Sequence, residues 1–306
     1  MDFKVSIVIV SWNTVDLLER CIESIFSTIN GMLFEVIVFD NASTDSSVSM
    51  VRSRFPSVHL IDNKQNLGFG GANNQAFNIS RGEYILLLNP DTVLHPHAIS
   101  HLVSYLEQNL NVGVVGPKLI NPDGSIQLSA HPKPTLFREF WRLFHLDRII
   151  PKSQYPDNYF NTNSVRNVDV LKGACMLFRR TVIEQIGFFD DQFFMYSEEV
   201  DLCVRILEAG WHIRWIPQAE VTHLGGQSTN QVADTMFLEL YRNKIRYFRK
   251  HNNLITTQTY KVLLLITAVS RILFFGAYIF ASHRNQSTGR LLFRQYSFLI
   301  INLINM

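Results

Sequence analysis

Cysteine is scarce in this chain of 306 residues, and the three that occur, Cys21, Cys175 and Cys203, stand far apart in apolar surroundings. Their spacing matches neither a zinc site nor a disulfide framework. The sequence therefore gives no sign of a small disulfide-stabilised fold and favours a reducing compartment.

An excess of charge of one sign is also missing, because the formal net charge is only +2. Such a balance leaves no electrostatic signature of nucleic-acid binding, and we expect no nucleic-acid partner. Charged residues make up 18% of the chain and hydrophobic residues 47%, which argues against disorder. A chain of this length can hold one large domain or two modest ones.

No basic segment followed by an apolar stretch and a cleavage site precedes the first predicted strand, Val5–Val10. A secretory signal peptide would have that pattern. We therefore expect the protein in the cytosol or on the cytosolic side of a membrane.

The first 120 residues alternate between strand-like and helix-like segments. Continuous apolar runs indicate buried strands, and apolar residues spaced three and four apart indicate helices. Strands are predicted at Val5–Val10, Glu35–Phe39, Val58–Ile61 and Tyr84–Leu88, and helices at Val15–Ile29 with Thr14 as N-cap, after Asp45, and near 70–80. This order predicts an α/β fold with a Rossmann-like, mostly parallel sheet and helices on both of its faces.

The strand Tyr84–Leu88 ends abruptly at Asn89-Pro90-Asp91, because proline cannot continue a central strand. A carboxylate at the carboxyl end of such a strand lies where open α/β sheets bind ligands. Asp91 is thus a candidate ligand for a hard divalent cation that is shared with substrate phosphates. The alternative is that Asn89 and Asp91 only form a turn.

Polar residues follow two other strands at the same predicted edge of the sheet. Ser11 and Asn13 follow the first strand, and Asp40 and Asn41 follow the second. The glycine-containing loop at 66–73 could bring backbone close to a ligand, because glycine has no side chain. It is a poor match to the dinucleotide-binding fingerprint and does not follow the first strand.

Beyond Asp91 the pattern is looser. Asn121–Gly124 predicts a hairpin turn, and residues 131–168 predict a long surface excursion outside the core. An apolar segment at 168–180, a helix at Ser197–Ala209, a short strand at Ile213–Ile216 and a polar turn at Thr222–Ser228 are predicted after it.

Three acids, Glu198, Glu199 and Asp201, stand at the start of this helix and are candidates for a general base. Acids in a first helical turn often only complement the helix dipole, and Asp201 could form a simple i,i+4 pair with Arg205. His223 is a candidate metal ligand, although a lone histidine more often has a structural role.

The C-terminal region has a basic helix at 242–250 and an apolar segment, Val262–Ala281. The length of this apolar segment suits a membrane span, but Arg271 at its centre would cost about 2.5–3.5 kcal/mol on insertion scales. A helix in the plane of the membrane interface avoids that cost, and a buried helix of a soluble protein is a third possibility. We accordingly expect a core domain at 1–230 and a helical, membrane-associating region at 231–306.

Six motifs stand in the order of one known family: Val5–Asn13, Val38–Asp45, Asn66–Gly70, Leu88–Asp91, Phe194–Leu202 and His223. They resemble the inverting, nucleotide-sugar-dependent glycosyltransferases of family 2, which have the GT-A fold. The resemblance covers roughly residues 3–250, and six motifs in sequence are specific although each alone is weak. The chain looks most similar to bacterial rhamnosyltransferases that build cell-surface polysaccharides.

The resemblance implies roles for the matching positions. Asp40 would meet the pyrimidine N3–H of the nucleoside, Asp91 would bind Mg²⁺ or Mn²⁺ between the donor phosphates, and His223 would be a further metal ligand. Asn89 departs from the usual first aspartate of the metal motif. The implied donor-binding residues are Ser11, Asn13, Asp40, Asn41, Asn66, Gly68, Asn89 and Asp91.

The family's general base is the second acid of a Glu-Asp-x-Asp pattern, which is Glu199 here. Because glutamate replaces aspartate at that position, the choice between Glu198 and Glu199 stays open. Independently of the family, sugar transfer develops negative charge on the leaving phosphate, which a divalent cation stabilises. A base must deprotonate the attacking hydroxyl, and inversion requires it on the opposite face of the sugar.

The resemblance predicts a metal-dependent inverting glycosyltransferase, peripheral or monotopic at the cytoplasmic face of the cell membrane. The expected donor is dTDP-L-rhamnose and the expected acceptor a lipid-linked saccharide. Transfer from a UDP- or GDP-sugar and a non-catalytic module that binds sugar nucleotides or glycans are the alternatives. A sugar-phosphate nucleotidyltransferase would need a glycine-rich, basic fingerprint after the first strand, and Ser11–Thr14 offers none.

Overall fold

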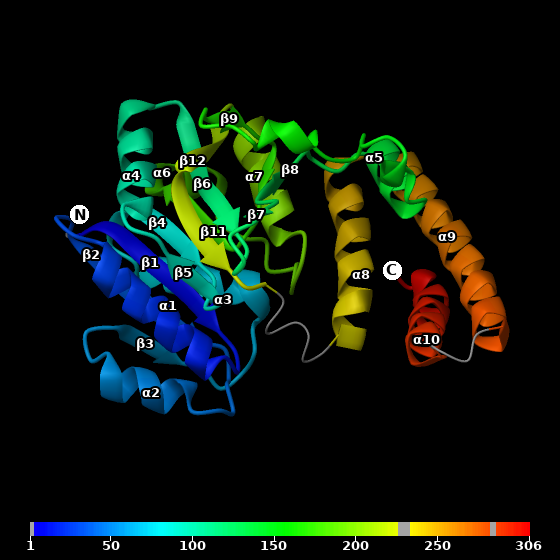
Figure 1. Cartoon of the computed structure of the whole chain (residues 1–306), viewed down its shortest axis with the longest axis horizontal. Coiled ribbons are helices and arrows are strands. Elements are labelled where there is room, and N and C mark those ends of the chain that lie inside the picture. Colours follow the sequence, from blue (N-terminus) through cyan, green and yellow to red (C-terminus); the bar gives the residue numbers. More distant parts are fainter. Residues whose placement is uncertain (1–2, 226–232, 282–285) are drawn as a thin grey trace. The chain divides into compact units, whose positions relative to one another are not determined.

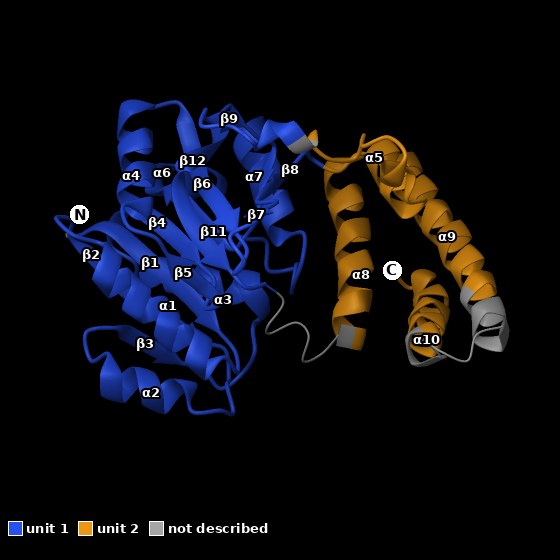
Figure 2. Cartoon of the chain, in the orientation of Figure 1, with its two compact units in different colours: residues 1–133, 157–231 blue, residues 134–156, 232–306 orange. Residues whose placement is uncertain are grey.

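The structure is a computed structural model that describes residues 3–225, 233–281 and 286–306. The chain divides into two compact units (Figure 2). Unit 1 consists of residues 1–133 and 157–231, and unit 2 of residues 134–156 and 232–306. Residues 134–156, which we expected in the core domain at 1–230, belong to unit 2.

Unit 1 contains the alternating elements that the sequence predicts, followed by a less regular second half. Its elements are β1 (Phe3–Ser11), α1 (Val15–Thr28), β2 (Phe34–Asp40), α2 (Ser47–Arg54), β3 (His59–Asp62), α3 (Gly68–Ile79), β4 (Gly82–Leu88), β5 (Thr92–Leu94), α4 (Ala98–Gln108), β6 (Val112–Ile120), β7 (Ile126–Gln127), β8 (Ala130–His131), the 3-10 helix η2 (Asp157–Tyr159), β9 (Arg166–Asn167), β10 (Val170–Leu171), β11 (Cys175–Arg179), α6 (Arg180–Ile186), α7 (Glu198–Glu208) and β12 (His212–His223).

The main sheet is mixed, with the strand order β3-β2-β1-β4-β11-β6-β12-β5 (Figure 1). Strands β1 to β4 are parallel to one another, as predicted. Strand β11 enters between β4 and β6 and is antiparallel to both, and β5 is antiparallel to β12. Strands β6 and β12 are parallel as well, so the sheet departs from the expected mostly parallel arrangement only where β11 and the other antiparallel strands enter. The reason is that β11 follows a long excursion of the chain, so no helical crossover sets its direction.

Both faces of the N-terminal half are covered by helices. Ile7 and Ile9 of β1 belong to the core cluster that also includes residues of α1 and α4. Val8 is equally buried but lies outside that cluster, and α3 contacts β1. Because side chains alternate across a strand, a strand buried on both faces is apolar throughout. This explains the continuous apolar run at β4 and the apolar run at β1, which only the buried Ser6 interrupts.

Helix α1 forms where it is predicted, with two differences in detail. Thr14 occupies the N-cap position, but its hydroxyl lies 3.0 Å from Oγ of Ser11 and caps no backbone N–H. Leu18 and Ile22 are buried as expected, whereas Phe26 is 41% exposed. Its ring lies near those of Phe34 and Phe55 toward the end of the helix.

The second half of unit 1 agrees with its prediction at the hairpin and differs from it at the last strand. The Asn121–Gly124 turn joins β6 to β7 as an antiparallel hairpin, as predicted. Strand β12 is much longer than the short strand expected at Ile213–Ile216, so His223 ends a strand and does not lie in a turn. Residues 226–228 of the predicted turn lie outside the described residues.

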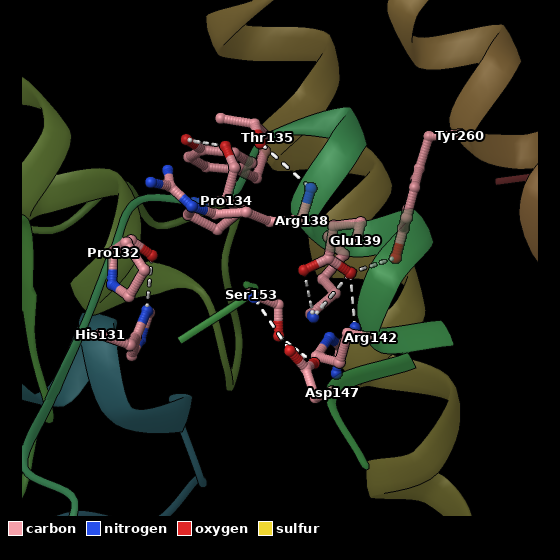
Figure 3. Close-up of polar contacts among 12 residues, drawn as sticks. His131, Pro132, Pro134, Thr135, Arg138, Glu139, Arg142, Asp147, Ser153 and Tyr260 are labelled. Carbon is pink, nitrogen blue, oxygen red and sulfur yellow. Dashed lines mark hydrogen bonds and ion pairs between the residues drawn. The ribbon is translucent and has the colours of Figure 1, made fainter. Parts of the chain in front are cut away.

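Unit 2 is helical, with α5 (Leu136–Leu143), the 3-10 helix η1 (Leu146–Arg148), α8 (Ala233–His251), α9 (Leu254–Ala281) and α10 (Gln286–Leu303). The buried Glu139 carboxylate lies 3.0 Å from Nζ of Lys244 and also pairs with Arg142 and the Tyr260 hydroxyl (Figure 3). Burial acts to raise the pKa of Glu139, but Lys244 and Arg142 outweigh it and lower that pKa. The expectation that 131–168 is only a surface excursion is therefore wrong for α5, whose Leu143 is also buried.

Helix α9 has one face inside unit 2 and another exposed. Tyr260, Leu264 and Ala268 are buried. The guanidinium of Arg271 bonds the Leu143 carbonyl at 2.9 Å, and it also bonds the Tyr296 hydroxyl and Nε2 of His145. Exposed apolar side chains recur on the other face at helical spacing, at Ile255, Val262, Ile266, Val269 and Leu273. No helix in the described ranges is both long and apolar enough to cross a bilayer.

Candidate active site

The carboxyl ends of β1, β2 and β4 meet at one edge of the sheet, as the sequence predicts. Strand β1 lies between the other two and is parallel to both. Ser11 at the end of β1 is opposite Asp40 at the end of β2. Asn89 directly follows β4, and its backbone N–H donates to the Ala174 carbonyl at 2.9 Å. The polar residues singled out in the sequence are thus gathered at one rim.

Asp40 presents an acceptor with no partner among the described residues. Its Oδ1 accepts the backbone N–H of Ser43 at 2.8 Å, whereas its buried Oδ2 makes no hydrogen bond. Burial raises the pKa of the Asp40 carboxyl, and the hydrogen bonds from Ser43 oppose that shift. A buried acceptor of this kind is costly unless a ligand donates to it. The residue therefore fits recognition of an N–H group.

Ser11 and Asn13 connect the loops at this rim. Ser11 is fully buried and its hydroxyl meets Thr14. Asn13 has a left-handed backbone with φ of 52°, and its Oδ1 accepts the N–H of Thr44 at 2.8 Å. The backbone N–H of Asn13 donates to Oγ of Ser43 at 2.9 Å. The bonds of Asn13 join the loop after β1 to the loop after β2, and the contact of Ser11 lies within the loop after β1.

Asn41 and Asn66 order the glycine-containing loop. Nδ2 of Asn41 donates to Oδ1 of Asn66 at 2.8 Å and to the Gly68 carbonyl at 3.2 Å. Oδ1 of Asn41 accepts the Leu67 N–H at 2.8 Å. Both carboxamides therefore have partners within the chain.

Gly68 is required by a contact with protein backbone. Its φ is +72°, and a Cβ at this position would lie 2.2 Å from the Phe194 carbonyl oxygen. The neighbouring N–H of Phe69 donates to the same oxygen at 3.0 Å. The close approach that the sequence suggested thus involves Phe194, and it ties this loop to the segment that leads into α7.

Asp91 and His223 face each other at the rim. Strands β5 and β12 pair antiparallel with Thr92 opposite His223, which places Asp91 beside the end of β12. Nε2 of His223 lies 3.4 Å from Oδ1 of Asp91, and both side chains are buried. The Leu224 N–H donates to the Asp91 carbonyl at 3.0 Å. Two residues 132 positions apart are therefore held as a pair by the sheet.

Gln127 on β7 completes this arrangement, and sequence reasoning missed it. Its Oε1 lies 2.6 Å from Nδ1 of His223, and its Nε2 donates to Oδ1 of Asn121 at 2.9 Å and to the His223 carbonyl at 3.2 Å. An amide oxygen can only accept, so Nδ1 carries a proton and Nε2 is the ring nitrogen that faces Asp91. The hairpin around Gln127 was predicted, but no local signal marked this side chain.

The Asp91 and His223 pair fits a divalent cation. A carboxylate oxygen and an imidazole nitrogen that face each other are suitable donors for Mn²⁺, and Mg²⁺ binds through one or two carboxylates with substrate phosphates and water. The bond from Nδ1 to Gln127 is the usual support of a ligating histidine. Within the described residues no cluster of three or more acids, histidines or cysteines forms. Any bound ion would therefore share its remaining positions with phosphate or water.

The three acids of α7 have different surroundings. Asp201 is fully buried and pairs with Nε of Arg205 at 2.9 Å, so the i,i+4 alternative describes it. Glu198 is buried, and burial together with the charge of Glu199 raises its pKa well above the ordinary value. Glu199 is only half-buried.

The backbone before α7 is unusual. Tyr196 and Ser197 both have left-handed conformations, with φ of 70° and 66°. Such conformations cost about 1–3 kcal/mol each for residues other than glycine and tend to persist at functional sites. Here they set the direction from which Glu198 and Glu199 enter the first turn.

Comparisons with known proteins identify the family that the chain matches. The family described as "Glycosyl transferase family 2" matches residues 6–187. The chain is 33% identical over 211 residues to an N-acetylglucosaminyl-diphospho-decaprenol L-rhamnosyltransferase of Mycobacterium tuberculosis, covering 64% of this chain and 68% of that protein. It is 23% identical over 253 residues to rhamnosyltransferase WbbL of Escherichia coli, covering 80% and 93%.

A solved structure shows the same fold. A mannosyltransferase from Pyrobaculum calidifontis, in complex with GDP-Man and Mn²⁺, has a TM-score of 0.57 at 16% identity and covers 99% of this chain and 88% of its own. GalNAc-T7 with UDP, GalNAc and Mn²⁺ has a TM-score of 0.56 at 15% identity, covering 72% and 44%. The sheet, its rim and the sequence match together lead to one conclusion: the chain belongs to glycosyl transferase family 2.

Proposed function

We propose that the protein is an inverting, metal-dependent glycosyltransferase that moves L-rhamnose from dTDP-L-rhamnose to a lipid-linked saccharide in cell-surface polysaccharide synthesis. The Asp91 and His223 pair at the strand rim carries this proposal, because it is a two-ligand site suited to a cation shared with a diphosphate. The choice of sugar and acceptor is supported by the names of the mycobacterial and E. coli relatives.

Residues at the rim would bind the metal ion and the donor nucleotide. Asp91 and His223 would hold Mg²⁺ or Mn²⁺, which as a Lewis acid stabilises the negative charge of the departing diphosphate. The free Oδ2 of Asp40 would accept the N3–H of the thymine ring. Gln127 would keep His223 in the tautomer whose Nε2 can ligate.

Glu199 is the better candidate for the general base. Burial and the charge of Glu199 raise the pKa of Glu198 well above its ordinary value and so favour its protonated form, which cannot take up another proton. Glu199 as a residue is only half-buried, although its Oε2 is a buried atom, and it would accept the proton of the incoming hydroxyl. Direct displacement with one base and no covalent intermediate inverts the anomeric centre.

The proposal includes docking of unit 2 on a membrane surface. The exposed stripe on α9 from Val262 to Leu273 is apolar at every turn, and Arg271 has its partners inside unit 2. A helix that lies in the interface buries such a stripe without placing a charge in hydrocarbon. Lys244 and Arg242 of the basic helix already pair with Glu139 and Glu239. The support therefore comes from the apolar stripe more than from the basic residues, and the cytoplasmic side stays a prediction.

The test is a panel of nucleotide sugars with Mn²⁺, scored by release of nucleoside diphosphate with and without polyprenyl-diphosphate-linked N-acetylglucosamine. Acceptor-dependent release from dTDP-L-rhamnose alone is expected. Release from a UDP- or GDP-sugar alone would replace the donor. If every donor binds and none is turned over, the protein is a binding module and the proposal fails. Asp91→Ala should abolish metal-dependent release, and full activity in that variant would remove the proposed metal ligand.

A further inference from the structure

Lys172 is a cation near Glu199 that none of the roles above uses. It lies between β10 and β11, and its backbone N–H donates to the Ser129 carbonyl at 2.8 Å. The side chain is half-buried. Burial lowers the pKa of its ammonium group, while the Glu199 carboxylate acts to raise it.

The ammonium of Lys172 has no anchored counter-charge. Across the part of the chain that the structure describes, no carboxylate forms an ion pair with it. Its interaction with Glu199 is a longer-range electrostatic attraction. Partly removing a lysine from water without a partner is unfavourable. In other half-buried lysines of unit 1 the charge is paired, as in Lys118 with Glu220 at 2.7 Å. The position therefore suits an anion that arrives with a ligand.

The neighbours of Lys172 place it beside the proposed chemistry. A Cβ on the next residue, Gly173, would lie 3.7 Å from the Phe69 ring and 3.9 Å from Cβ of Glu199. The carbonyl of Ala174 accepts the N–H of Asn89. The turn at 172–174 thus contacts both the base on α7 and the residue that follows β4.

We propose that Lys172 binds the diphosphate of the lipid-linked acceptor and so places the acceptor hydroxyl at Glu199. This inference rests on the proposed function. The donor diphosphate already has a site at Asp91 and His223, whereas the acceptor hydroxyl must approach Glu199. In a sugar joined to its lipid through a diphosphate, the anion and the reacting hydroxyl are separated only by the sugar ring. Lysine is a common phosphate ligand, and its flexible stem allows it to follow such a group.

The test compares two acceptors that differ only in charge: N-acetylglucosamine linked through a diphosphate to a short polyprenyl chain, and the neutral glycoside of the same chain. Lys172→Gln should raise the KM for the diphosphate acceptor about tenfold or more and leave the neutral acceptor unchanged. Lys172→Arg should keep most of the affinity. Lys64→Gln, at an exposed surface lysine, is the matched control and should behave as wild type.

Two further binding measurements distinguish acceptor binding by Lys172 from a role in donor binding or an effect on Glu199. Calorimetry of the diphosphate-linked saccharide without donor should show the same tenfold loss, and it tests Lys172 even if the wild type transfers no rhamnose. The affinity for dTDP with Mn²⁺ should not change. Weaker dTDP binding would assign Lys172 to the donor and overturn the proposal. Equal losses with both acceptors, together with a shifted acid limb of the pH–rate profile, would mean that Lys172 acts only through Glu199, and would overturn it too.

Discussion

Oε1 of Gln127 lies 2.6 Å from Nδ1 of His223, on the side of the imidazole ring away from Asp91. Removing this acceptor frees the ring to rotate and to change tautomer. Gln127→Met keeps the side-chain volume and should lower Mn²⁺ affinity about 10–100-fold, measured by electron paramagnetic resonance. Gln75→Ala, at an exposed glutamine of α3, should change nothing. Unaltered Mn²⁺ binding in a folded Gln127→Met variant would separate Gln127 from the metal site.

The two glutamates of α7 are expected to respond differently to the same substitution. Glu199→Gln should lower kcat about 10²–10⁴-fold with unchanged donor affinity, because only the acceptance of a proton is lost. Glu198→Gln should have a much smaller effect, because burial and the charge of Glu199 raise the pKa of Glu198 and favour its uncharged form. Steady-state kinetics and nucleotide titration check both. The reverse pattern would make Glu198 the base.

The Asp40 carboxylate is expected to lower the stability of the fold and to strengthen dTDP binding. Because burial raises the pKa of Asp40 above its ordinary value of 3.8, the folded state holds that proton more tightly than the unfolded state. Stability therefore falls as the pH rises from the ordinary pKa through the raised one. Asp40→Asn should raise Tm relative to wild type at neutral pH but not at low pH, and it should weaken dTDP binding. A variant with lower Tm at neutral pH would contradict this account.

A substitution at Gly68 tests the contact between the loop at 66–68 and the segment before α7. Gly68→Ala meets both the left-handed backbone and the Phe194 carbonyl, so it should cost more than the roughly 1–2 kcal/mol of a left-handed alanine. Gly31→Ala has a similar φ of +70° with open space around it and should cost only that amount. Urea unfolding of both variants isolates the contact. Equal losses would show that the Phe194 segment moves freely aside.

The exposed stripe on α9 should determine membrane binding. Ile266→Asn with Leu273→Asn removes two apolar side chains that are 50% and 69% exposed, and should weaken vesicle binding about tenfold or more. Leu33→Asn with Leu110→Asn, at exposed leucines of unit 1, is the matched control. Sedimentation with vesicles of mixed zwitterionic and anionic lipid measures this. Identical binding by both double variants would argue against docking through α9.

The sequence alone was sufficient for the features that depend on local pattern. The runs at Val5–Val10 and Tyr84–Leu88 are apolar because both faces of the sheet are covered, and the rim follows because parallel strands end at a common edge. The helix that carries Glu198 and Glu199 and the hairpin at Asn121–Gly124 were predictable for the same reason. Each of these follows from the residue pattern within one segment or from the order of neighbouring segments.

Tertiary structure decided the rest, because it brings together residues that are distant in the chain. The antiparallel entry of β11, the contact of Gly68 with Phe194 and the support of His223 by Gln127 all join separate segments. The placement of α5 within unit 2 depends on the pairing of Glu139 with Lys244, 105 residues further along. No local periodicity records such pairings, since the burial of a charge becomes favourable only when its partner arrives from elsewhere in the fold.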